Sequence, residues 1–94
     1  MRFRIMEQRI MVAESMRREI DELTNSNRLG TARNYRRALN SFMSFLGAKD
    51  IPFSAVTESL IDEYNGFLIR RGVVRNTVSF YMRILRAVYN KAVQ

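Results

Sequence analysis

Two segments of the sequence place arginine at helical spacing without any acidic residue. The first, TARNYRRAL, runs from Thr31 to Leu39, and the second, TVSFYMRIL, runs from Thr77 to Leu85. Both read Thr-x-x-x-Tyr-x-Arg-x-Leu, which puts Tyr and Leu on one side of a helix and Arg on another. Arginine binds phosphate through a planar fork of N–H donors. The chemistry that these segments indicate is the binding of a polyanion.

The polar faces that contain these arginines extend beyond the two segments. On the first helix the face comprises Arg33, Arg37, Asn40 and Ser44, with Arg36 to one side. On the second it comprises Ser79, Arg83, Arg86 and Asn90, with Arg75 just before the helix. A solvated helix surface usually mixes charges, because Glu–Lys pairs one turn apart stabilise it. The absence of acids from both faces favours a nucleic-acid surface over a merely solvated one.

The overall charge supports the same partner. The chain has 94 residues and a net charge of +7, and all but two of its 16 basic residues are arginine. Residues 1–30 contribute six arginines against five acids, whereas residues 31–94 contribute ten basic residues against four acids. The excess therefore lies in the last two-thirds of the chain and predicts a polyanionic partner there.

The composition does not favour catalysis or metal binding. The chain has no histidine and no cysteine, its carboxylates lack metal-ligand spacing, and no glycine-rich phosphate loop occurs. Tyr35, Tyr64 and Tyr81 fall on apolar stripes and Tyr89 flanks one, so we expect them to pack rather than react. We expect no cofactor, no metal and no catalytic residue.

Membrane insertion and secretion are also not expected. No apolar run approaches the roughly 20 residues of a spanning helix. The N-terminus, MRFRIMEQRIM, begins with positive charge, but Glu7, Gln8 and Arg9 interrupt its apolar residues as they would not in a signal peptide. The sequence predicts a cytoplasmic protein that joins the nucleoid when bound to DNA.

The apolar pattern predicts an all-α chain that forms one helical unit over residues 1–94. We expect helices at about 5–24, 31–46, 57–71 and 76–92, and no segment alternates at period two for long enough to be a strand. The stripes expected to be buried are Ile5, Val12, Met16, Ile20 and Leu23; Tyr35, Leu39, Phe42 and Leu46; Leu60, Ile61, Tyr64, Phe67 and Leu68; and Tyr81, Leu85, Val88 and Ala92.

Capping residues suggest the helix ends. Thr31, Thr57 and either Asn76 or Thr77 are predicted N-caps, and Gly47 and Gly72 are predicted to end their helices. The polar loop TNSNRLG closes with Gly30, and the connector AKDIPFSAV carries the only proline, Pro52. Gly66, in mid-helix, suggests close packing of a second helix.

The ordered pair of motifs resembles a known module. GTARNYRRALNSFMSFLG, followed by RGVVRNTVSFYMRILRAVYNKAV, is similar to the core-binding domain of tyrosine recombinases, the phage-integrase and mobile-element integrase family. The later run, with its R-N-T-[VI]-S-x-Y-x-R-x-L-R pattern leading into an asparagine, matches closely at residues 75–90. The resemblance covers roughly Ile5 to Gln94.

This resemblance implies a fold, partners and site residues. The fold would be a compact orthogonal bundle of four or five helices of the SAM-like type, clamping one side of a recombination site. A separate C-terminal catalytic domain, which carries the family's tyrosine nucleophile and H-x-x-R motif, would grip the other side. The residues implied in DNA contact are Arg33, Asn34, Arg36, Arg37, Arg75, Asn76, Thr77, Ser79 and Arg83, to which the polar faces add Asn40 and Arg86. The helix at about 5–24 would contact neighbouring recombinase protomers. Lacking the H-x-x-R motif, the chain itself is not expected to be an enzyme.

Two other functions fit parts of the sequence. A helical transcription regulator would show a short turn between its recognition helices and would bind a palindrome as a dimer. A protein-interaction domain would use the methionines of the first helix, Met6, Met11 and Met16, as an adaptable surface. Alternatively, those methionines fill the chain's own core.

Overall fold

Helices account for almost all of the regular structure in the computed structural model, which describes residues 10–93. The α-helices are α2 (Val12–Asn25), α3 (Leu29–Leu46), α4 (Glu58–Arg70) and α5 (Arg75–Val93), with a 3₁₀ turn, η1 (Phe53–Ala55), before α4. Within this part of the chain the only extended pairing is a single bridge between Met11 and Pro52. The all-α prediction is confirmed. Ile5 and Met6 lie outside the described residues.

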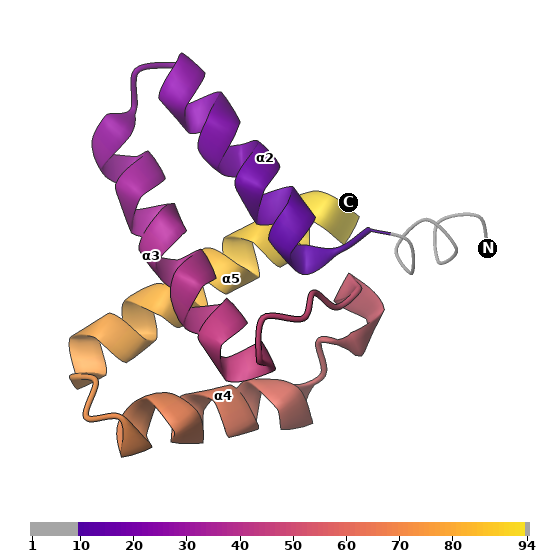
Figure 1. The fold of residues 1–94 in the computed structure, drawn as a ribbon, viewed down its shortest axis with the longest axis vertical. Coiled ribbons are helices and arrows are strands. Elements are labelled where there is room, and N and C mark those ends of the chain that lie inside the picture. Colours follow the sequence, from indigo (N-terminus) through magenta and orange to yellow (C-terminus); the bar gives the residue numbers. More distant parts are fainter. Residues whose placement is uncertain (1–9, 94) are drawn as a thin grey trace.

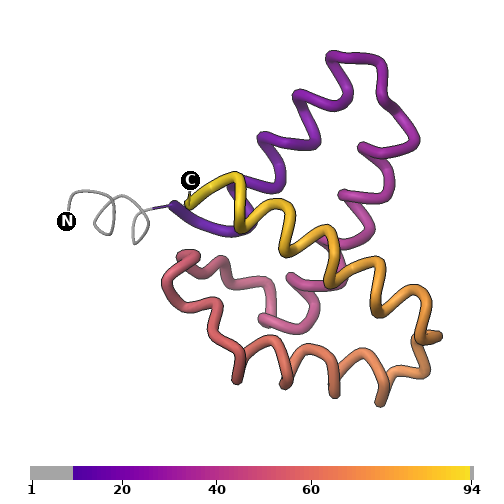
Figure 2. Tube along the Cα trace, turned by 180° about the vertical axis from the view of Figure 1, so that it is seen from behind, coloured from indigo at the N-terminus to yellow at the C-terminus, as the bar shows by residue number. Residues whose placement is uncertain are grey.

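Helix α5 crosses α3 and contacts all three other α-helices (Figure 1). α2 and α3 form an antiparallel pair, α4 follows below them, and α5 passes behind α3 in the view of Figure 1. Seen from the other side, α5 lies in front (Figure 2). α5 contacts α2, α3 and α4, and the molecule is only 21 Å deep along the viewing direction against 41 and 35 Å across it. The bundle is therefore two helices thick.

The core lies between these layers. Its buried side chains come from every α-helix and from η1; the largest fully buried ones are Tyr64, Phe42, Phe53, Met16, Leu68 and Val12. The ring of Tyr64 meets that of Phe42 edge-on at 5.0 Å between centroids, and Phe45 and Phe67 extend the cluster. The predicted stripes supply most of the core. Among the larger buried side chains, Phe53, Val78 and Ile84 were missed, and Tyr35 and Tyr81 are only half-buried.

Helices α2, α3 and α4 end in the same way. Asn27, Gly47 and Gly72 adopt left-handed φ values of 62°, 71° and 78°. The residue after each donates its N–H to a carbonyl five positions back: Arg28 to Leu23, Ala48 to Met43 and Val73 to Leu68. This is the Schellman arrangement, which satisfies carbonyls that the helix leaves free. The two predicted glycine ends are confirmed, while the first loop turns at Asn27 and Gly30 belongs to α3.

The N-termini depart further from prediction. Thr57 caps α4 as expected, its Oγ1 accepting the N–H of Leu60 at 3.1 Å. Thr31 is wrong as a cap, because α3 begins at Leu29 without any side-chain cap. Asn76 and Thr77 are also wrong as caps, because α5 already begins at Arg75. A Cβ at Gly66 would meet only the Arg70 side chain, so this glycine does not mark close helix packing.

The N-terminus of α2 is capped from a distant part of the chain. The carboxylate of Asp50 accepts the N–H of Ala13 at 2.8 Å and that of Glu14 at 3.2 Å, across 37 and 36 residues. Oδ1 of Asp50, which accepts from Ala13, also accepts the N–H of Ile51 at 2.8 Å. Val12 donates to the Ile51 carbonyl and Phe53 to the Ile10 carbonyl. Asp50 thus fixes the connector against the start of α2.

Replacing Asp50 should destabilise the fold. Asp50→Ala removes both the acceptor and the negative charge at the start of α2, and should lower the free energy of unfolding by about 1–2 kcal/mol. Asp50→Asn keeps one acceptor oxygen and should cost less. Urea denaturation followed by circular dichroism measures both. Glu63→Ala, which removes an exposed carboxylate from α4, is the control; equal losses in Asp50→Ala and Glu63→Ala would contradict the capping role.

Candidate nucleic-acid interface

Most predicted residues of α3 lie on its exposed face. Burial of Ala38, Leu39 and Phe42 against the rest of the bundle turns the opposite side of the helix outward. The exposed residues there are Arg33, Arg36, Arg37, Asn40 and Ser44. Asn34 is half-buried. The helical repeat of 100° per residue places it beside Ser41, seven residues on, whose Oγ lies 2.7 Å from the Tyr64 hydroxyl of α4.

Arg36 lies toward α2 rather than on the centre of this face. It shares an open groove of about 570 Å³ with Arg17, Asp21 and Asn40. The α3 face is free of acids along the helix itself, as predicted, but Asp21 of the neighbouring helix adds negative charge at its α2 side. The positive potential should therefore be greater on the Arg37 side of α3 than on the Arg36 side.

The predicted residues of α5 are likewise exposed, with one exception. Arg75, Asn76, Ser79, Arg83, Arg86 and Asn90 are exposed, and Thr77 is half-buried. Arg86 shares a second groove, of about 530 Å³, with Glu58, Asp62 and Ile61 of α4. The acids that the sequence confines to one helix thus lie near Arg86 after folding. Arg83 lies on the exposed face away from this groove.

The two arginine faces point to opposite sides of the bundle. α5 packs on the back of the layer that contains α3 (Figures 1 and 2). Each helix turns its buried residues toward the other, so their exposed centres must point apart across the 21 Å depth. Arg33 and Asn40 face one side, and Ser79 and Asn90 face the other. The structure does not bring all predicted residues onto one flat surface.

The N-terminal parts of α3 and α5 lie at the same edge of the molecule (Figure 1). In Figure 1 the N-terminal half of α3 and the first turns of α5 lie on the same side of the molecule, where they diverge from their crossing. On α3, Asn34, Arg37 and Ser41 form one stripe, because Arg37 is one turn from both of the others, and Ser41 contacts Tyr64 of α4. On α5, Asn76 and Thr77 lie in the first turn. We call these five residues, together with Arg83 two turns beyond Asn76, the α3–α5 edge.

The repeated motif is equivalent in three dimensions. Thr31 is the third residue of α3 and Thr77 the third of α5. The matched threonines and tyrosines are half-buried, Arg37 and Arg83 are exposed, and Leu39 and Leu85 are buried. The two helices therefore present the same polar side at the same distance from their N-termini.

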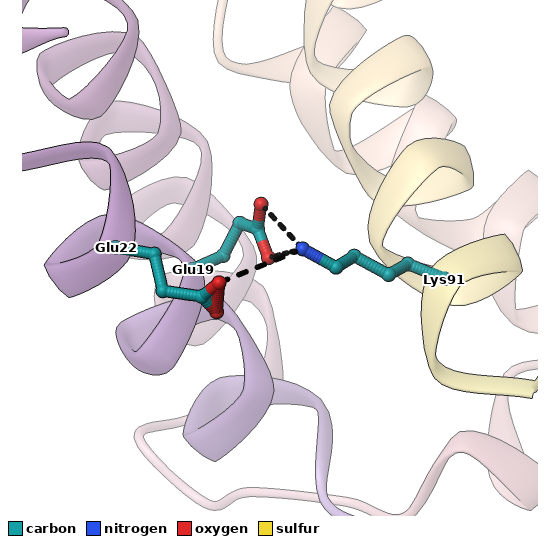
Figure 3. A network of polar contacts seen from close by, with 3 residues as sticks. All are labelled: Glu19, Glu22 and Lys91. Carbon is teal, nitrogen blue, oxygen red and sulfur yellow. Dashed lines mark hydrogen bonds and ion pairs between the residues drawn. The ribbon is translucent and has the colours of Figure 1, made fainter. Parts of the chain in front are cut away.

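Lys91, near the end of α5, is engaged by acids of α2. Its Nζ lies 2.8 and 3.1 Å from the two carboxylate oxygens of Glu19 and 3.9 Å from Glu22 (Figure 3). The hydrogen bond and charge of Glu19 raise the pKa of Lys91. This lysine joins α5 to α2, and its charge is balanced locally.

The prediction missed Arg71 as a binding candidate. Its guanidinium carbon lies 4.5 Å from the centroid of the Phe67 ring, and Phe67 packs at 5.3 Å on Phe45 of α3. The sequence signal is an aromatic residue four positions before an arginine, which places both on one side of a helix. Sequence reasoning instead treated Arg70 and Arg71 as complements to the dipole of α4.

The four tyrosines lie in the core or pack against it. Between residues 10 and 93 no three Asp, Glu, His or Cys side chains gather where they could hold a metal ion. Tyr64 is fully buried, and desolvation raises the pKa of its phenol to about 12, although the hydrogen bond with Ser41 opposes the shift. The phenol is therefore neutral near pH 7 and contributes packing and one hydrogen bond.

Comparison with known proteins identifies the family. Residues 11–94 match the family model described as the Phage integrase SAM-like domain. The chain belongs to this family, the helical N-terminal module of phage integrases and tyrosine recombinases, and has an integrase-related role. A search of curated proteins and a search of solved structures each found no match. In residues 10–93 no helix has the length and apolar character to cross a membrane.

The raised pKa of Tyr64 should appear in the pH dependence of stability. The phenol titrates at about 12 when folded and at about 10.0 in its ordinary state, so the folded state holds its proton more tightly. The stabilisation is present below pH 10 and is lost as pH rises toward 12. Tyr64→Phe should flatten this fall by an amount on the order of 2 kcal/mol. Urea denaturation between pH 8.5 and 11.5 tests it, and parallel curves for variant and wild type would contradict it.

Proposed function

We propose that this chain is the DNA-binding clamp module of a site-specific tyrosine recombinase or integrase. It would hold double-stranded DNA for a separate catalytic domain and so contribute to DNA integration and recombination. The observation that carries the proposal is the α3–α5 edge, where two equivalent helices expose Arg37, Arg83 and Asn76 beside the half-buried Asn34, without an acid among them. Family membership supports the same function.

The edge suits a duplex better than either broad face does. A duplex lying against one broad face would reach the exposed arginines of only one of the two helices, because the centres of these faces point apart across the 21 Å depth of the bundle. At the edge the duplex would meet the N-terminal turns of both helices, whose free amides add favourable sites for phosphate. Arg33 and Ser79 would flank this contact. Arg36 and Arg86, which share grooves with acids, would contribute least.

The alternative functions account for less of the structure. In a helix-turn-helix regulator a short turn would join the recognition helices, whereas η1 and α4 separate α3 from α5. In a protein-interaction domain the methionines of α2 would be available to a partner. Met16 is fully buried in the core, so the core explanation accounts for it, whereas Met11 is half-buried and forms a backbone bridge with Pro52.

Binding of duplex DNA should depend on the arginine of each helix. Fluorescence anisotropy across a salt series should show affinity falling with a log–log slope of roughly −3 to −5, as expected for four or five phosphate contacts. Arg37→Ala and Arg83→Ala should each weaken binding at low salt and make the slope shallower by about one. In the double variant the log–log slope should become shallower by about two.

Two matched controls test the edge itself. Arg86→Ala removes one charge from α5 three residues after Arg83, and Arg18→Ala removes one from α2, where Arg18 pairs with Glu14 at 3.4 Å. Both should change the slope less than Arg37→Ala does. Equal effects from all four single variants would point to net charge rather than to the edge. A wild-type chain that ignores DNA at low salt would overturn the proposed function and favour the interaction-domain alternative.

A further inference from the structure

We infer that Arg71, at the end of α4, is a phosphate-binding residue that adds a third helix to the α3–α5 edge. This inference rests on the proposed function and extends it to a residue that neither repeated motif contains. It starts from the different placement of two adjacent arginines of equal charge, Arg70 and Arg71.

Arg71 is held on the side of α4 that meets α3. Its guanidinium lies over the Phe67 ring at 4.5 Å, and Phe67 in turn packs on Phe45 of α3 and on Tyr64. Tyr64 is bonded to Ser41, one of the edge residues. A chain of ring contacts thus connects Arg71 to the stripe of α3 that contains Asn34 and Arg37. α4 also ends on the side of the molecule where α5 begins (Figure 1).

Stacking on Phe67 leaves the guanidinium able to bind an anion. A cation over a ring face uses its flat side, while the N–H donors around its rim remain free for phosphate oxygens. The residue is exposed, so a phosphate can reach it. Because the ring already restricts the side chain, less conformational entropy is lost when the contact forms.

Arg70 has the same charge but a different orientation. Its guanidinium lies back along α4 over Gly66, 3.1 Å from where a Cβ on that glycine would be. Gly66 and Phe67 are adjacent in one helix, so their directions from the helix axis differ by about 100°. Arg70 lies over Gly66 and Arg71 over Phe67, so the two guanidinium groups lie on different sides of α4. Arg70 is therefore a matched control, equal in charge and adjacent in sequence.

The test compares Arg71→Ala with Arg70→Ala by anisotropy on duplex DNA across the same salt series. Arg71→Ala should weaken binding about three- to tenfold at low salt and make the slope shallower by about one. Arg70→Ala should change affinity less than about twofold. Arg71→Lys, which keeps the charge but loses the planar stack, should keep the slope yet bind more weakly than wild type. Circular dichroism melts establish that each variant is folded.

Two results would overturn the inference. One of them leaves the proposed function standing, and the other overturns it as well. If wild type binds DNA while Arg71→Ala and Arg70→Ala lose equal affinity, Arg71 has no special contact and the proposed function stands. If wild type does not bind DNA at low salt, the proposed function fails and the inference fails with it. Loss confined to Arg71→Ala, with a shallower slope, supports it.

Discussion

The packing of α5 across the other three α-helices is the constraint on which the arrangement of charge depends. Val78, Ile84, Leu85 and Val88 are buried because α5 lies against α2, α3 and α4 at once. A helix covered along one side has only the opposite side left for polar groups. The same holds for α3 in the other layer. Hydrophobic burial therefore turns the centres of the two exposed faces in opposite directions, while the N-terminal parts of both helices still lie on the same side of the molecule (Figure 1).

Local partners separate the structural charges from those available to an anion. The ion pairs between described residues join Glu14 to Arg18 and Lys91 to Glu19 and Glu22. All three involve α2, whose acids engage its own arginine and the far end of α5. The first turns of α3 and α5 contain no acidic residue. The net charge is distributed so that positive groups near the α3–α5 edge are not neutralised by neighbours on their own helices.

Much of the fold is predictable from local patterns. Helical periodicity locates the four helices, and Thr57, Gly47 and Gly72 are recognised because their roles depend on nearby backbone geometry. Thr31 and Thr77 misled for a physical reason: each is half-buried at the third helical position, where threonine serves the packing rather than the cap. The cap that Asp50 provides could not be predicted from the sequence, because no local pattern connects that residue to Ala13. Which helix faces share a surface likewise depends on tertiary packing, so sequence reasoning identified exposed arginines but not that they face apart.

The cap supplied by Asp50 has a consequence for the order in which the chain is made. Ala13 precedes Asp50 by 37 residues, so at about 5–20 residues per second the start of α2 is synthesised roughly 2–7 s before its capping carboxylate. During that interval the first amides of α2 have no partner from the connector. The α2–α3 pair, complete by Leu46, can close early, whereas the start of α2 must await the connector. Vectorial synthesis thus makes the cap of α2 available after α2 and α3 have been synthesised but before α4 and α5.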